Sequence, residues 1–182
     1  MVESEVVVRT AELGDLESIV ELHTRARTVY YRAGGLSDAE LDEPDGPARR
    51  LDGWSRSIQD DAKTVLCAVR AGTVVGAIAM GPPLNPDNDA DRVGELYQIF
   101  VHPDSWSHGV GSRLHAAFVR FLVDASLPLG RLETWERNAR ARAFYARHGW
   151  RPDGQTVPGP GNSHYLRLTL DVAATGPVTV GR

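Results

Sequence analysis

The chain has 182 residues, of which 42% are hydrophobic and 24% are charged, and its formal net charge is −4. This length and composition predict one globular domain with a full core, and are short for two domains. The negative charge argues against non-specific nucleic-acid binding, which needs a basic surface, and no apolar run approaches the roughly 20 residues that span a bilayer.

Apolar periodicity, caps and turn residues predict five elements before residue 81. In chain order they are a strand at Val6–Arg9, a helix from Leu16 to about Tyr31, a short helix around Arg49–Asp60, and strands at Thr64–Arg70 and Thr73–Met80. Asp15 is the expected N-cap of the first helix. The acidic segment Ser37–Asp52 contains two prolines and is expected to be largely irregular. Ala71–Gly72 joins the two strands and predicts a hairpin.

The rest of the chain predicts a proline-rich loop at Gly81–Arg92, six regular elements and a flexible tail at Val172–Arg182. In chain order the elements are a strand at Val93–Val101, a helix from about Gly109 to Ala125, a strand at Leu129–Glu136, a helix at Ala139–His148, and strands at Gln155–Val157 and His164–Asp171. Asn138 is the expected N-cap of the second helix, and Gly149 its left-handed stop. The order predicts one mixed α/β domain over residues 6–171, built on a mostly antiparallel sheet with one strand–helix–strand crossover.

Charge, cysteine content and the N-terminus give further expectations. Residues 1–105 carry 10 basic and 19 acidic side chains, whereas residues 106–182 carry 10 basic and 5 acidic ones. This asymmetry suggests a cleft whose C-terminal half meets an anion, although chance scatter explains it equally well.

The lone Cys67 excludes an internal disulfide, and His102 and His108 have no third ligand at useful spacing, so we expect no metal. Met1–Thr10 lacks a secretory pattern, which leaves the cytoplasm as the expected location.

A glycine-rich loop carries the strongest chemical signal. The sequence His-Gly-Val-Gly-Ser at residues 108–112 follows a strand and opens a helix. Gly109 and Gly111 let the main chain approach a ligand closely, and the free N–H groups of a first helical turn attract anions. A dinucleotide fingerprint would need glycine in place of Leu114, and a P-loop would need a lysine that only position 63 supplies. The pattern therefore predicts a diphosphate cradle of another kind.

Two segments in this order, Leu96–Leu114 and Leu132–Trp150, resemble the GNAT acetyltransferase superfamily. The resemblance extends to the order of elements over nearly the whole chain. It implies a central sheet of six to seven strands flanked by helices, in which a splayed strand pair holds acyl-CoA. It also implies acetyl-CoA as the acyl donor, a primary amine on a small molecule or peptide as the acceptor, and a possible homodimer.

The resemblance assigns cofactor contacts to twelve positions. They are Ile99, Phe100, Val101, Ser107, His108, Gly109, Val110, Gly111, Ser112, Arg113, Asn138 and Tyr145. The first three would hold the pantetheine and the thioester carbonyl, the loop would hold the pyrophosphate, and Asn138 would touch the pantetheine. Trp106 is a departure, because the family usually has Gln or Arg there; this puts loop rigidity and cofactor affinity in question.

Proton transfer needs an acid and a base. By resemblance Tyr145 faces the thioester sulfur, and a phenol with a pKa near about 10 can protonate a thiolate whose pKa is about 8.5. The alternative is a tyrosine that only packs on an amphipathic helix. For the base, Glu133 and Glu95 are rival candidates on neighbouring strands, and either can equally be a solvated carboxylate.

The resemblance also implies an acceptor site formed by residues 16–60, 81–92 and 153–163. The first two ranges are net acidic, which favours a cationic amine, and Tyr30, Tyr31 and Trp54 could line the site.

Two other functions compete with catalysis. A non-catalytic acyl-CoA-binding or sensing module is kept open by Trp106, whereas a Rossmann-type nucleotide protein is disfavoured by the missing third glycine and the antiparallel hairpins.

Overall fold

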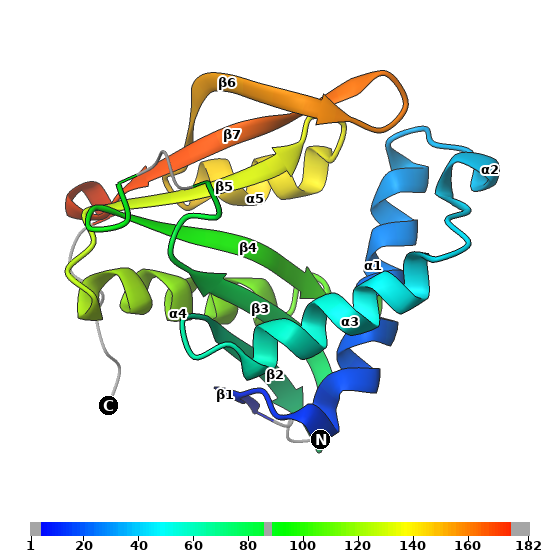
Figure 1. The fold of residues 1–182 in the computed structure, drawn as a ribbon, viewed down its shortest axis with the longest axis horizontal. Coiled ribbons are helices and arrows are strands. Elements are labelled where there is room, and N and C mark those ends of the chain that lie inside the picture. The colour runs from blue at the N-terminus through cyan, green and yellow to red at the C-terminus, as the bar shows by residue number, and fades with distance from the viewer. Residues whose placement is uncertain (1–4, 86–88, 176–182) are drawn as a thin grey trace. The chain divides into compact units, whose positions relative to one another are not determined.

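The computed structural model describes residues 5–85 and 89–175 (Figure 1). The chain divides into two compact units, the first of residues 1–81 and 96–118 and the second of residues 82–95 and 119–182. The prediction of a single domain over residues 6–171 therefore stays a prediction. Among the described residues, none of the helices is long and apolar enough to cross a membrane.

The regular elements follow the predicted order. They are β1 (Val6–Thr10), α1 (Leu16–Ala33), α2 (Asp38–Leu41), α3 (Gly46–Gln59), β2 (Thr64–Arg70), β3 (Thr73–Gly81), β4 (Val93–Val101), α4 (Val110–Asp124), β5 (Leu129–Trp135), α5 (Ala139–Arg147), β6 (Arg151–Gly159) and β7 (Ser163–Asp171). The strand order is β1-β2-β3-β4-β5-β7-β6, with β4 and β5 parallel. This confirms the predicted mixed α/β fold with a mostly antiparallel sheet.

In the first unit, α1 and α3 pack on one face of the antiparallel strands β1, β2 and β3 (Figure 1). Side chains alternate between the two faces of a strand, so Val65, Cys67, Ala77 and Ala79 all point to these helices. There they meet Ile19 and Leu22 of α1 and Trp54 of α3, and together these residues form a continuous buried cluster. Burial raises the pKa of the Cys67 thiol to about 12, so this cysteine is an inert apolar side chain.

The opposite face of β3 holds the beginning of α4. A Cβ added at Gly76 would stand 2.9 Å from Leu114 Cδ1 and 3.0 Å from Val110 Cγ1, both on α4. It would also stand 3.2 Å from the carbonyl oxygen of Phe100 on β4. Glycine at position 76 therefore lets the first turn of α4 lie directly on the sheet.

In the second unit, β5, β7 and β6 form an antiparallel layer beside α5 (Figure 1). Trp135 is buried at the end of β5, where its indole N–H donates to Ser163 Oγ at 2.6 Å. The side chain of Asn138 accepts from the Ala141 N–H at 3.1 Å and begins α5, and Gly149 ends it with φ of 86°. Both caps of this helix are confirmed.

Three local details differ from expectation. The segment expected to be irregular contains α2, and α3 already begins at Gly46. The Asp15 carboxylate does not cap α1; it pairs with Arg9 and accepts from the Glu12 N–H, because a nearby guanidinium binds it more strongly than an amide does. Residues 172–175 form a short 3₁₀ helix, while residues 86–88 of the predicted loop and 176–182 of the predicted tail lie outside the described residues.

Candidate functional site

The loop between β4 and α4 turns sharply at Gly109, as its glycine predicts, and also at Ser107, whereas Gly111 lies inside α4. Ser107 and Gly109 both have left-handed backbone angles, with φ of 65° and 76°, and α4 begins at the next residue, Val110. Both loop residues are exposed, whereas Val110 is buried. The main chain therefore turns sharply in solvent and then enters a helix whose first N–H groups have no partner within the helix. Such an arrangement is typical of anion-binding sites.

Trp106 ties this loop to the end of β4. Its indole N–H donates to the Val101 carbonyl at 2.9 Å. The Phe100 carbonyl faces Gly76 of β3, and the His102 N–H donates to Val75 of β3 at 2.9 Å. Because successive backbone groups of a strand point to opposite sides, the Val101 carbonyl points away from β3. The residue that departs from the usual family pattern thus braces the loop against the strand.

The Arg113 side chain points away from the loop. Its guanidinium lies 3.3 Å from the Val6 carbonyl and 3.8 Å from the Glu5 carboxylate, at the N-terminal strand. The predicted cradle would therefore consist of main-chain groups of residues 107–112, without the Arg113 side chain.

The two candidate bases, Glu95 and Glu133, have different surroundings in the second unit. Arg131 donates to the Glu95 carboxylate at 2.9 Å, the Leu84 N–H also donates to it at 2.9 Å, and the Glu95 side chain is 13% exposed. Glu133, two residues further along β5, is exposed and has no comparable clamp among the described residues. Partial burial and the nearby Glu95 charge raise the pKa of Glu133, opposed by Arg131 and Arg167.

Tyr145 lies inside the second unit. Its ring is 6% exposed and packs edge-on against Phe144 and Trp150, with centroid distances of 5.4 and 5.8 Å. Burial raises the pKa of its phenol above the ordinary value, so the hydroxyl keeps its proton throughout the neutral range. Tyr145 therefore packs as a tyrosine on an amphipathic helix would. It also has the protonated state that a proton donor needs.

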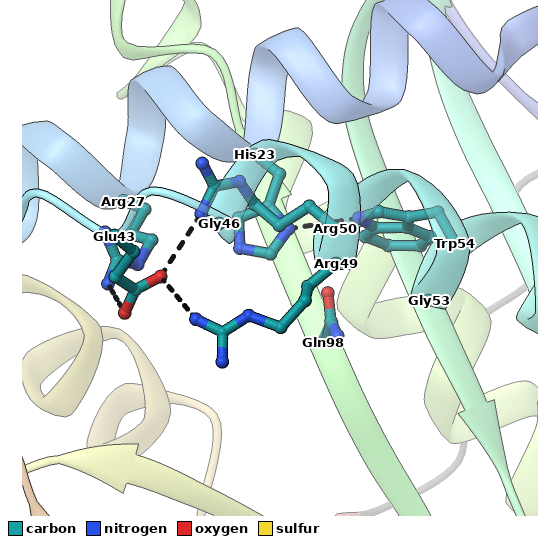
Figure 2. A pocket seen from close by; sticks show the side chains of 9 residues that line it. All are labelled: His23, Arg27, Glu43, Gly46, Arg49, Arg50, Gly53, Trp54 and Gln98. Carbon is teal, nitrogen blue, oxygen red and sulfur yellow. Dashed lines mark hydrogen bonds and ion pairs between the residues drawn. The ribbon is translucent and has the colours of Figure 1, made fainter.

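A cavity of about 340 Å³ lies in the first unit (Figure 2). Its polar and aromatic lining comes from α1, the segment before α3, α3 itself and β4. The side chains are His23, Arg27, Glu43, Arg49, Arg50, Trp54 and Gln98. Of the three aromatic residues predicted to line the acceptor site, Trp54 lies here. Tyr31 is instead buried in α1 with the Arg27 guanidinium over its ring, and Tyr30 packs on Tyr31.

His23 connects the cavity to β4. Its ring stacks on Phe100, with centroids 4.0 Å apart, and its Nδ1 accepts from the Trp54 indole N–H at 3.0 Å. Burial, and then the charges of Arg50 and Arg27, lower the pKa of His23 to about 3. The ring is therefore neutral, and with Nδ1 an acceptor its hydrogen is on Nε2. The sequence signals for this site were the i, i+4 pair His23 and Arg27 and the paired arginines that open α3.

Residues 16–150 match the sequence profile of the Acetyltransferase (GNAT) family. The chain belongs to this family. It is 26% identical over 139 residues to an uncharacterized N-acetyltransferase of Archaeoglobus fulgidus, covering 76% of this chain and 88% of that protein. It is 27% identical over 156 residues to the mycothiol acetyltransferase of Sanguibacter keddieii, covering 86% of this chain and 42% of that protein.

Solved structures share the GNAT fold. The PaiA N-acetyltransferase of Thermoplasma acidophilum, solved in complex with coenzyme A, matches with a TM-score of 0.69 and 18% identity over 90% of this chain and 98% of its own. An N-acetyltransferase from Staphylococcus aureus Mu50 matches with a TM-score of 0.71 and 16% identity over 93% of this chain and 99% of its own.

The two units of this GNAT acetyltransferase divide the predicted site residues. The first unit brings together Ile99, Phe100, Val101 and the loop residues 107–113, and the second unit holds Glu95, Glu133, Asn138 and Tyr145. In the described part of the chain, no cluster of three or more His, Cys, Asp or Glu side chains could hold a metal ion.

Proposed function

We propose that this acetyltransferase transfers an acetyl group from acetyl-CoA to a primary amine by direct attack. The observation that carries the proposal is the exposed loop in which Ser107 and Gly109 take left-handed angles immediately before α4. A diphosphate fits this loop because its ligands would be main-chain N–H groups, which need no particular side chain. Ser112 can add a hydroxyl donor, and the Trp106 indole ties the loop to Val101.

The strand that precedes the loop supports a pantetheine contact. The parallel ladder of β4 with β5 has three residue pairs and ends at Glu95 and Arg131. Ile99, Phe100 and Val101 lie beyond the last pair, and the Val101 backbone points away from β3. The proposal therefore assigns the pantetheine and the thioester carbonyl to the main chain of these three residues. The Val101 carbonyl already accepts from Trp106, which leaves its N–H as the group to be used.

Acetyl-CoA would supply an acyl carbon for attack and a thiolate as leaving group. Tyr145 donates its phenolic proton to the sulfur as the carbon–sulfur bond breaks. Burial raises the pKa of Tyr145, so the phenol holds its proton until the departing sulfur takes it. Glu133 accepts the proton that the amine nitrogen loses as the carbon–nitrogen bond forms, directly or through water. Solvent then returns both groups to their starting protonation states.

Glu95 has a positioning role in this proposal. Its carboxylate is held in place by Arg131 and by the Leu84 N–H. Its charge contributes to the raised pKa of Glu133.

Binding of acetyl-CoA is the first test. At 100 times its dissociation constant, acetyl-CoA should stabilise the fold by about 2.7 kcal/mol, which a thermal melt detects, while NAD and ATP should have no effect. Gly109→Ala should lose about 1 kcal/mol of stability, because alanine disfavours the φ of 76° although its Cβ would contact nothing. We expect it to bind acetyl-CoA at least about tenfold more weakly, since the loop must relax.

Gly14→Ala is the matched control, because that glycine has open space, no left-handed angle and no part in the loop. An unchanged melting temperature of the wild-type protein at millimolar acetyl-CoA would refute the proposal. Stabilisation by acetyl-CoA without transfer to any amine would instead favour the non-catalytic acyl-CoA-binding module.

Trp106→Phe tests the brace. The variant keeps the ring and removes the hydrogen bond to Val101, which is worth about 0.5–1.5 kcal/mol. We expect the dissociation constant of acetyl-CoA to rise about 3–10-fold while kcat stays within twofold, measured by calorimetry and by steady-state kinetics. An unchanged dissociation constant would show that the loop holds its conformation without the indole.

A further inference from the structure

The cavity of the first unit carries more positive than negative charge (Figure 2). Arg27 Nη2 lies 2.7 Å from one oxygen of Glu43. Arg49 Nη2 and Arg50 Nη1 lie 3.4 and 3.7 Å from the other oxygen. Three guanidinium groups thus share one carboxylate, and within the described residues no second carboxylate pairs with any of them.

This excess of charge is partly shielded from water. The Arg27 and Arg50 side chains are 16% and 13% exposed, and buried cations are usually matched by an anion. Burial and the neighbouring Arg27 lower the pKa of Arg50, because the single glutamate does not offset them. Two further lining residues carry donor groups, since neutral His23 has a hydrogen on Nε2 and Gln98 has a side-chain amide. The lining is suited to an anion with several oxygen acceptors.

We propose that this cavity binds an anionic group, a carboxylate or a phosphate, carried by the amine acceptor. The inference rests on the proposed acetyl transfer and names the class of its acceptor, an amine with an acidic group on the same molecule. The cavity adjoins the proposed acyl-donor contacts on β4, since Gln98 lines it and the lining residue His23 stacks on Phe100. An acceptor anchored here by its anion keeps its amine free to react.

The prediction of a cationic acceptor rested on the acidic residues counted over 16–60. Of those residues, Glu43 lines the cavity, and it is already paired with Arg27 at 2.7 Å. A polycation would instead meet three arginines. The arginines could instead have a purely structural role, holding the segment around Glu43 to α1 and α3. An experiment must distinguish this role from anion binding.

Matched acceptors test the proposal by turnover. L-amino acids and β-alanine would each be compared with their own amide, and phosphoethanolamine with ethanolamine, with spermidine as the polycation, by following thiol release from acetyl-CoA. We expect the best anionic amine to exceed its neutral partner about tenfold or more in kcat/KM. Whether the carboxylate or the phosphate series shows this preference identifies the anion.

Arg49→Gln should lower kcat/KM about tenfold for the anionic amine and less than twofold for the neutral one. The Arg49 side chain is 68% exposed, so this variant should fold. Arg56→Gln is the control on the same helix, because Arg56 is 74% exposed, pairs with Asp52 and does not line the cavity. It should change neither value.

Binding provides a readout that needs no turnover. N-acetyl-β-alanine, N-acetyl-phosphoethanolamine and the N-acetylated amino acids should raise the melting temperature of the wild-type protein more than their neutral counterparts do, and Arg49→Gln should abolish the difference. Equal effects of acids and amides, a preference for spermidine, or an Arg49→Gln variant that changes only stability would each overturn the inference. Failure of acetyl-CoA itself to stabilise the protein would refute the proposed function instead.

Discussion

Replacing Tyr145 with phenylalanine is expected to lower kcat about 10²–10⁴-fold, the range that general acid catalysis contributes. Without the phenol, the thiolate must leave unprotonated or take its proton from water. The ring contacts with Phe144 and Trp150 survive in Tyr145→Phe, so the melting temperature and the dissociation constant of acetyl-CoA should stay close to wild type. The measurement is steady-state kinetics beside a thermal melt of each protein.

Tyr165→Phe is the appropriate control, because Tyr165 lies on β7 and has no assigned role in transfer. A Tyr145→Phe variant that keeps more than about a tenth of wild-type kcat would show that the buried tyrosine is a packing residue. If Tyr145→Phe lowers both kcat and the melting temperature, the loss of activity follows from lost packing, and the conclusion is the same.

Glu133→Gln is expected to lower kcat/KM for the amine about 10²-fold at neutral pH, at the low end for a general base because the side chain is exposed and water can partly replace it. The base acts only when ionised, so wild-type activity should fall as pH falls through the pKa of Glu133, which lies above that of an ordinary glutamate. The variant should lack this acidic limb.

At higher pH the difference between the two proteins should shrink. An amine whose pKa is about 10.4 loses its own proton there, and the need for a base decreases. Glu95→Gln is the matched comparison: it breaks the pairing with Arg131 and lowers the pKa of Glu133 by removing a like charge. We therefore expect Glu95→Gln to move the acidic limb to lower pH, whereas complete loss of that limb would make Glu95 the base.

Much of the fold and the sharp turn before α4 were predictable because the signals are local. Gly109 and Gly149 take left-handed angles that few other residues tolerate, and Asn138 caps the helix that immediately follows it. The hairpin of β2 and β3 follows from two short apolar strands around Ala71–Gly72. In each case the residues that decide the conformation lie within a few positions of one another, so the sequence alone determines the outcome.

The tertiary structure decided what depends on distant residues. Glu95 and Glu133 look equivalent in the sequence, and only the parallel register of β4 and β5 places Arg131, 36 residues away, on Glu95. Likewise, the number of acidic residues in 16–60 does not indicate that three arginines gather around Glu43. Arg27 reaches it from α1, and Arg49 and Arg50 reach it from α3. Helix packing and strand register set which charges meet, and a side chain's pKa and ligand preference follow from those neighbours rather than from the local sequence.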